Sequence, residues 1–265
     1  MDKINKFQMI NNNTTRFSNR VEDYVKYRPG YPSGIISFLQ ETYQLTTDKM
    51  IADIGSGTGI SGKLFLDNHY HVIGIEPNKA MREKSEELLK GYPGFQAIDA
   101  TAENTTLNDG SMDAIIAGQA FHWFDREICR REFERILKPG GLLVLIWNER
   151  LVHNNFEKEY DKLIVKFSKD YQSVDHRNID LQSIEDFCAP HPVALKIFSN
   201  RQVFDFDGLK GRLLSSSYAP KENDENYPEM IHALTALFAD YQKDNKVEVA
   251  YDTKVYVSGF GYKNR

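Results

Sequence analysis

The sequence predicts an α/β fold built on a doubly wound, mostly parallel sheet, and three observations support this. Five short apolar runs alternate with helical stretches between residues 50 and 147, which is typical of a parallel sheet covered on both faces. A glycine-rich turn directly follows the first run. After residue 149 the rhythm changes to two long β-rich segments accompanied by helical ones. We therefore expect one domain with an antiparallel edge strand and a helical cap.

The first half of the chain gives most of the expected elements. The first fifteen residues are polar and are expected to be flexible. A short helical pattern at 19–25 precedes a turn, after which Pro32 can open a helix over about 33–43. Apolar runs predict core strands at 50–54, 71–75, 95–98, 113–117 and 142–147. Helices are expected between them at 60–68, 79–90 and 125–137.

The second half is expected to form the cap and the sheet edge. Helical patterns occur at 156–169, 208–218 and 228–244, and β patterns at 193–206 and 247–257. Within a single domain spanning 1–265, the sequence suggests four parts. These are an N-terminal lid segment (1–45), a nucleotide-binding core (46–148), cap helices with an edge strand (149–246) and a terminal strand (247–265).

Composition narrows the function classes. The net charge is −5 and no long basic run occurs, so we do not expect a nucleic-acid partner. No segment approaches the roughly 18–20 apolar residues of a membrane span, and no signal peptide is apparent. Cys129 and Cys188 are the only cysteines, and we expect reduced, interior thiols. These features favour a cytoplasmic protein without a membrane partner; the oligomeric state stays open.

The glycine turn is the most informative motif. The strand ending at Ile54 runs into Gly55-Ser56-Gly57-Thr58-Gly59, which opens a helix. Glycine allows left-handed backbone angles and lets a ligand approach closely, and the helix N-terminus offers unpaired N–H groups. Glu76 ends the second strand, where a carboxylate can accept hydrogen bonds from both ribose hydroxyls. Together these features predict a nucleotide site.

Two nucleotides compete for this site. The run from Gly57 to Gly62 satisfies the G-x-G-x-x-G pattern of NAD sites, but this frame starts two residues after the turn begins. Asp53, at the mouth of the first strand, would repel a pyrophosphate and would suit an ammonium group. These points favour a cationic, phosphate-free nucleoside over NAD. In the alternative interpretation, Asp53 only holds the loop by accepting backbone N–H bonds.

Four motifs in order resemble those of class I S-adenosylmethionine (SAM)-dependent methyltransferases, which have a Rossmann-like fold. They are Asp53–Gly59, Gly74–Asn78, the stretch from Ala100 through Asp113, and Lys138–Gly141. Three further motifs, at 24–32, 118–125 and 215–220, resemble the type 11, trans-aconitate methyltransferase-like small-molecule branch. Asn104-Thr105-Thr106 departs from that pattern, where relatives commonly carry Leu-Pro.

The resemblance implies SAM as the cofactor, a small-molecule acceptor and no metal. The cofactor-binding residues that it implies are Asp53, Gly55, Ser56, Gly57, Gly59, Glu76, Pro77, Met81, Thr101, Ala102, Gln119 and Phe121. Core packing is an equally good explanation for Met81.

The acceptor site is expected where strand four ends, because ligands of open α/β sheets bind outside the carboxyl ends of the strands. His122 is the candidate catalytic base, although a structural role is an alternative. Arg28 lies among tyrosines and could recognise an anion, unless it forms an ordinary surface ion pair. The candidate acceptor-binding residues are Tyr24, Arg28, Tyr31, His122, Trp123, Trp147 and Tyr218, with Asn148 a weaker candidate.

The leading hypothesis is therefore an enzyme that transfers a methyl group from SAM to a small molecule by in-line displacement. Two alternatives stay open. One is a SAM-binding regulatory protein without turnover, and the other is an NAD-dependent oxidoreductase. The sequence does not identify the acceptor or the methylated atom.

Overall fold

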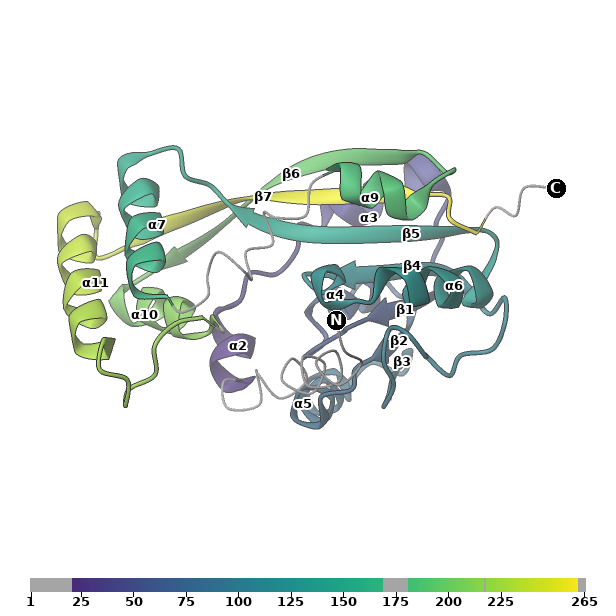
Figure 1. The fold of residues 1–265 in the computed structure, drawn as a ribbon, viewed down its shortest axis with the longest axis horizontal. Helices are drawn as coiled ribbons and strands as arrows, with labels where there is room; N and C mark the ends of the chain where they lie inside the picture. Colours follow the sequence, from purple (N-terminus) through teal and green to yellow (C-terminus); the bar gives the residue numbers. More distant parts are fainter. Residues whose placement is uncertain (1–20, 169–180, 217, 262–265) are drawn as a thin grey trace, which may run out of the picture.

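The computed structural model describes residues 21–168, 181–216 and 218–261, and it confirms the predicted fold class. Seven strands form one sheet in the order β3-β2-β1-β4-β5-β7-β6 (Figure 1). Strands β1 to β5 pair in parallel, whereas β7 lies antiparallel to both β5 and β6. The N-terminal stretch expected to be flexible and residues 262–265 of the predicted terminal segment lie outside the described residues.

The observed elements follow the predicted order closely. The strands are β1 (Met50–Ile54), β2 (His71–Ile75), β3 (Phe95–Ile98), β4 (Met112–Gly118), β5 (Leu137–Arg150), β6 (Val193–Phe204) and β7 (Val247–Ser258). The helices are α2 (Val21–Tyr27), α3 (Gly34–Tyr43), α4 (Ile60–Leu66), α5 (Lys79–Leu89), the 3₁₀ turn η1 (Phe121–Trp123), α6 (Arg126–Ile136), α7 (Asn155–Phe167), α9 (Leu181–Cys188), α10 (Phe206–Leu214) and α11 (Tyr227–Tyr241). The sequence did not predict η1 and α9.

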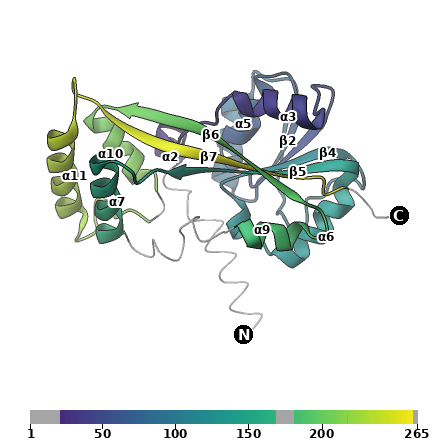
Figure 2. The ribbon, with the colours of Figure 1, turned by 90° about the horizontal axis from the view of Figure 1, so that it is seen from above.

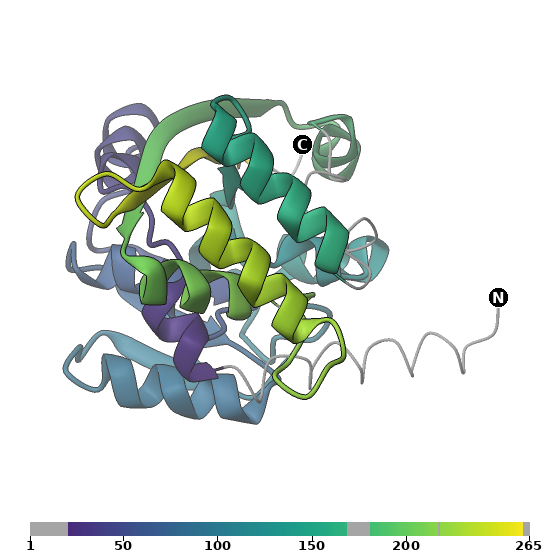
Figure 3. The same ribbon diagram turned by 90° about the vertical axis from the view of Figure 1, so that its left-hand side faces the viewer.

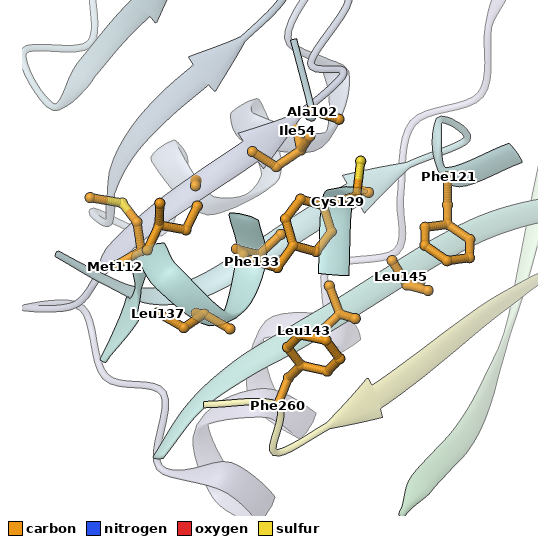
Figure 4. Close-up of a cluster of buried hydrophobic side chains, with 14 of the residues drawn as sticks. Ile54, Ala102, Met112, Phe121, Cys129, Phe133, Leu137, Leu143, Leu145 and Phe260 are labelled. Atoms are coloured by element: carbon orange, nitrogen blue, oxygen red, sulfur yellow. The ribbon is translucent and has the colours of Figure 1, made fainter. Parts of the chain in front are cut away.

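Helices cover both faces of the parallel part of the sheet. Apolar side chains of α3, α4 and α5 pack on one face, and those of α6 and α9 pack on the other. Figure 2 shows α3 and α5 on one side of the sheet and α6 and α9 on the other. Figure 4 shows Phe133 and Cys129 of α6 against Leu143 and Leu145 of β5. Burial of both faces explains why the core strands read as continuous apolar runs rather than as alternating patterns.

Strand β5 is longer than predicted and carries the fold into the cap. Its pairing with β4 shifts register between Met112 and Ala114. Residues Lys138–Gly141, expected to form a turn before the strand, are therefore an irregular part of β5 itself. At its other end β5 continues to Arg150, paired with β7. Strands β5, β6 and β7 thereby extend beyond the parallel strands toward a separate group of helices (Figure 1).

These helices, α7, α10 and α11, are called the helical cap below. Helices α7 and α11 lie side by side at the end of the long strands (Figure 3). Their apolar faces, together with residues of β6 and β7, form a core of their own that includes Tyr160, Leu209, Leu234 and Val249. Helix α2 packs on α10 and also contacts α5, so it lies between the cap and the core helices.

Both cysteines are free thiols buried in the core, as predicted. Burial raises the pKa of the Cys188 thiol to about 11. Across the described ranges, no helix combines the length and apolar character needed to cross a membrane.

Candidate active site

The glycine turn joins the ends of β1 and β2. The amides of Gly55 and Ser56 both donate to the Ile75 carbonyl, at 2.9 and 3.2 Å. Gly55 has φ +67°, and a Cβ there would lie 2.7 Å from the Cβ of Ala120. Gly57 has φ +56°, yet a Cβ there would meet no atom within 4 Å. The loop is therefore closed against the protein at Gly55 and open toward a ligand at Gly57.

Glu76 fastens the same turn from the side of β2. Its carboxylate accepts the Gly57 amide at 2.9 Å and the Asn78 amide at 2.8 Å. The side chain is buried, and this burial raises the pKa of Glu76 above its ordinary value despite the two amides. The amides occupy one position on each carboxylate oxygen, and an oxygen can accept more than one hydrogen bond. Glu76 can therefore shape the loop and still receive a ligand hydroxyl.

A pocket opens beside this turn and is called the glycine-loop pocket. It is lined by Tyr24, Gly55, Gly57, Glu76, Pro77, Asn78, Met81, Thr101, Ala102, Glu103, Gly118, Gln119, Ala120, Trp123 and Phe124. Two carboxylates are among these residues, and Lys, Arg and His are not. Negative lining favours a cationic ligand and disfavours a pyrophosphate.

Asp53 lies beneath the turn and lines neither this pocket nor its neighbour. Its carboxylate accepts the Ser61 hydroxyl at 2.7 and 2.9 Å and also the Gly62 amide. Complete burial raises the pKa of Asp53 to about 7, although both hydrogen bonds act in the opposite direction. This geometry favours the alternative interpretation, in which Asp53 holds the loop to α4.

A second pocket, called the arginine pocket, lies between the core and the cap. Its lining residues are Tyr24, Arg28, Pro29, Tyr31, Gly55, Ser56, Ile60, Ser61, Gly118, Gln119, Asn148, Arg150, Arg212, Tyr218 and Tyr251. The arginines come from three separate elements: the end of α2, the end of β5 and α10. Acidic side chains are not among the lining residues.

Long-range hydrogen bonds hold the segment that carries Arg28. Arg28 Nη2 donates to the Ser215 carbonyl at 3.1 Å, and the guanidinium lies 5.0 Å from the centre of the Tyr24 ring. Asn148 Nδ2 donates to the Gly30 carbonyl at 3.1 Å, and Gln202 Nε2 donates to the Tyr27 carbonyl at 3.1 Å. Hydrogen bonds with the end of α10 and with strands β5 and β6 therefore fix the position of this segment.

The two pockets share a wall made of Tyr24, Gly55, Gly118 and Gln119. Gln119 has φ +58°, a strained value for a non-glycine residue. Its amide donates to the Ile146 carbonyl at 2.9 Å, and its side chain donates to the Asn148 carbonyl at 3.2 Å. The strained conformation is therefore held by β5, at the point where ligands in the two pockets would meet.

The structure brings most predicted site residues to these pockets. Besides Asp53, those that line neither pocket are Gly59, Phe121, His122 and Trp147. Gly59 is the N-cap of α4. Phe121 and Trp147 are buried in the core, where Figure 4 shows Phe121. The His122 ring lies against Trp123, with ring centres 4.5 Å apart and the ring planes tilted by 45°.

Two predicted residues line the pocket opposite to the one expected. Ser56, expected at the cofactor, lines the arginine pocket instead. It comes directly after Gly55, which lines both pockets. Trp123, expected at the acceptor, lines the glycine-loop pocket, because η1 turns it toward that side of the wall.

Sequence reasoning missed Arg150, Arg212 and Tyr251, and named Asn148 only as a weak candidate. Arg150 follows the predicted fifth strand at its carboxyl end, which is a usable signal. Arg212 and Tyr251 sit in an ordinary amphipathic helix and an alternating strand, and nothing local distinguishes them.

Comparisons with known proteins agree with this geometry. Residues 52–145 match a family model described as a methyltransferase domain. An uncharacterised methyltransferase-like protein of Schizosaccharomyces pombe is 29% identical over 158 residues, covering 59% of this chain and 60% of that protein. An uncharacterised methyltransferase of Mycobacterium tuberculosis is 31% identical over 148 residues, covering 56% and 58%. The chain therefore spans less than two thirds of the length of these curated relatives.

Solved structures share the fold across most of the chain. A Haemonchus contortus phosphoethanolamine N-methyltransferase, solved with phosphomonomethylethanolamine and S-adenosylhomocysteine, superposes with a TM-score of 0.56 at 13% identity. It covers 94% of this chain and 58% of that one. Residues 52–145 therefore match a methyltransferase-domain model, and the chain shares the Rossmann-like fold of solved methyltransferase structures.

Proposed function

We propose that this protein transfers a methyl group from SAM, bound in the glycine-loop pocket, to a small molecule bound in the arginine pocket. One observation carries the proposal: the two pockets meet at a shared wall at the carboxyl end of the sheet, and they carry opposite charge. The methyltransferase names of the relatives and the S-adenosylhomocysteine in the Haemonchus structure support it.

The lining of the glycine-loop pocket supports SAM as its ligand. Gly57 leaves room where any other residue would place a Cβ, so a nucleoside can approach the backbone. Glu76 lies where it can receive ribose hydroxyls, and Pro77 and Met81 can pack against the adenine, with Thr101 and Ala102 at its polar edge. The acidic lining suits a cation and opposes the two phosphates of NAD.

The chain's own residues would act mainly by positioning. When bound, SAM supplies a methyl group that is activated by a sulfonium. Gln119, Tyr24 and Gly118 separate the pockets and would set the direction from which an acceptor approaches. Reactant alignment contributes up to roughly 7–11 kcal/mol in favourable cases. The cap, closing over this wall, would exclude water.

Several finer predictions belong to this proposal. They include the small-molecule branch that contains trans-aconitate methyltransferase-like enzymes, the lid role of residues 1–45 and the cap role of residues 149–246. General-base catalysis by His122 is the weakest of them, because its ring packs on Trp123 and lines neither pocket. A cytoplasmic location remains a prediction from composition.

Binding and turnover test the proposal separately. Calorimetry with SAM, S-adenosylhomocysteine and NAD should show micromolar binding of the first two and much weaker binding of NAD. Tighter binding of NAD would contradict the cofactor assignment. Incubation with methyl-labelled SAM and a metabolite extract should then transfer label to a small molecule. Binding without transfer to any acceptor fraction would favour a regulatory protein.

A further inference from the structure

The arginine pocket has an unusual charge for a buried space. Arg28, Arg150 and Arg212 all line it, and Arg212 is only 7% exposed. The Arg150 side chain is 10% exposed. Buried cations are costly unless they are paired, so the partners of each guanidinium decide what the pocket can bind.

Only one of the three arginines forms an ion pair with a described residue. Arg150 pairs with Asp161 of α7. Arg212 donates to two hydroxyls, Tyr251 Oη at 3.1 Å and Ser216 Oγ at 3.2 Å.

Within residues 21–168, 181–216 and 218–261, the partners of Arg28 are also neutral. Its Nη2 donates to a carbonyl and its guanidinium lies over the Tyr24 ring, while its buried Nε has no hydrogen-bond partner in these ranges. Two positive charges in the pocket are thus left without a carboxylate among the described residues.

The surrounding groups respond to this excess of positive charge. Burial together with the charge of Arg212 lowers the pKa of Arg28. Burial alone would raise the pKa of Tyr218, but the charges of Arg150, Arg212 and Arg28 lower it below its ordinary value. For Arg212, burial is outweighed by the neighbouring tyrosines, which raise its pKa instead. The positive charges of the pocket thus affect Arg28 and Tyr218, and carboxylates are not among the residues that line it.

We infer that the arginine pocket binds a compact molecule with two negative charges through Arg28 and Arg212, and that this dianion is the methyl acceptor. The inference deepens the proposed function and rests on it for the acceptor role, but not for the binding. A dicarboxylate and a phosphate monoester share the required chemistry, because guanidinium groups bind both through paired hydrogen bonds.

Arg212 and Arg28 would recognise the two ends of such a molecule from two separate parts of the chain. Arg212 belongs to the cap, and Arg28 follows α2. Because the pocket's wall includes Gln119 and Gly55, an anchored dianion would lie next to the glycine-loop pocket. Charge would therefore select the acceptor and also set its position.

Calorimetry on the full chain saturated with S-adenosylhomocysteine tests this inference. The probes are succinate, inorganic phosphate and uncharged succinamide at constant ionic strength. We expect succinate or phosphate to bind at least tenfold more tightly than succinamide. The stronger of the two anions would distinguish a dicarboxylate site from a phosphate site. Equal binding of all three probes would overturn the inference.

Matched variants locate the anion. Arg28→Met and Arg212→Met should each weaken anion binding at least tenfold while leaving S-adenosylhomocysteine affinity unchanged. The control is Arg201→Met, because Arg201 is exposed on β6, pairs with Glu248 and lies outside the arginine pocket. Retention of full anion affinity in both folded pocket variants, or an equal loss in the control, would contradict the assignment.

The two proposals can fail independently. If Arg212→Met unfolds, as its burial would allow, Arg28→Met still provides the test, with melting temperature as the check on folding. Anion binding without S-adenosylhomocysteine binding would refute the proposed function and keep the anion site. Binding of S-adenosylhomocysteine with no preference for dianions would refute the anion site and would leave the proposed function standing.

Discussion

The two pockets differ in how the chain builds them. The glycine-loop pocket comes, apart from Tyr24, from residues 55–124, and its key contacts are backbone groups and one carboxylate. The arginine pocket instead joins Arg28, Arg150, Arg212 and Tyr251. The hydrogen bond from Arg28 to the Ser215 carbonyl alone spans 187 residues.

Under the proposed function, this difference separates recognition of the cofactor from recognition of the acceptor. The glycine-loop pocket is made mostly from the turns that follow four consecutive strands, β1 to β4, so it depends largely on local backbone conformation. The arginine pocket is assembled from the segment after α2, strands β5 and β7 and the cap, so it depends on individual side chains, each of which can be substituted without changing the others. Proteins with this fold can therefore bind the same nucleotide cofactor and differ in the acceptor that they bind, as expected when function depends on the site and not on the fold.

The largest expected effect comes from closing the glycine-loop pocket. We predict that Gly57→Val weakens S-adenosylhomocysteine binding by about 100-fold or more, because the new side chain would project into the space that the ligand needs. Left-handed φ costs a non-glycine residue about 1–2 kcal/mol, so a modest fall in melting temperature is also expected. Calorimetry measures the first effect and thermal unfolding the second.

Gly110→Val is the matched control for this prediction. Gly110 also has φ +56°, and a Cβ there would meet no atom within 4 Å, but it lies outside both pockets. It should lose similar stability and keep its affinity for S-adenosylhomocysteine. In Gly57→Val, succinate binding should survive. Joint loss of both ligands would mean that the pockets are not independent.

The same contrast explains what the sequence could reveal. All seven strands and the sheet's antiparallel edge followed from apolar periodicity, because each run is local and, except in the edge strand β6, its residues are largely buried. Glu76 could be predicted from its place at the end of the second strand, whereas Pro77 was indicated by the resemblance between motifs. The short α9 was missed, because eight residues give only about two helical turns of periodic pattern.

The acceptor side was harder to predict for a physical reason. Tyr24, Arg28, Tyr31 and Tyr218 were identified by a resemblance between motifs, whereas Arg212 and Tyr251 reach the pocket only through the packing of α10 and β7. Local sequence carries no information on such pairings. Trp147, chosen for its place at the end of β5, instead packs in the core.

An intermediate effect is expected from disturbing the lid alone. The Tyr27 ring packs against Gly211 of α10, and a Cβ at Gly211 would lie 2.1 Å from Tyr27 Cε2. Overpacking of this kind costs about 1–3 kcal/mol. We predict that Gly211→Ala shifts α2 and the adjoining Arg28. Calorimetry should then show succinate binding weakened by about 30-fold, equivalent to about 2 kcal/mol.

Binding of S-adenosylhomocysteine should be nearly unchanged in Gly211→Ala, which separates the lid from the core. Gly34→Ala serves as the control, because a Cβ there would make only an ordinary 3.4 Å contact with Phe198. If Gly211→Ala lowers both affinities equally, the lid and the glycine-loop pocket are one cooperative unit. The conclusion that the two pockets can be altered independently would then be wrong.

The smallest expected effect concerns Asp53, beneath the wall between the pockets. Burial raises the pKa of Asp53 to about 7 in the folded protein, whereas the unfolded chain has the ordinary value of 3.8. Between these values the folded state keeps a proton that the unfolded state has lost, so stability falls as pH rises toward 7. Between pH 6 and 8 the loss should be about 1 kcal/mol.

Urea unfolding of wild type and Asp53→Asn at pH 6 and 8 measures this effect, which the variant should lack. Saturating SAM then distinguishes the two roles of Asp53. A carboxylate that faces the ligand's cation would ionise more easily on binding, so SAM would abolish the pH dependence and Asp53→Asn would bind SAM weakly. A carboxylate that only holds Ser61 would leave the dependence in place, since its charge then interacts with the loop and not with the ligand. The geometry favours the second outcome. If saturating SAM abolished the pH dependence of stability, Asp53 would instead contact the cofactor.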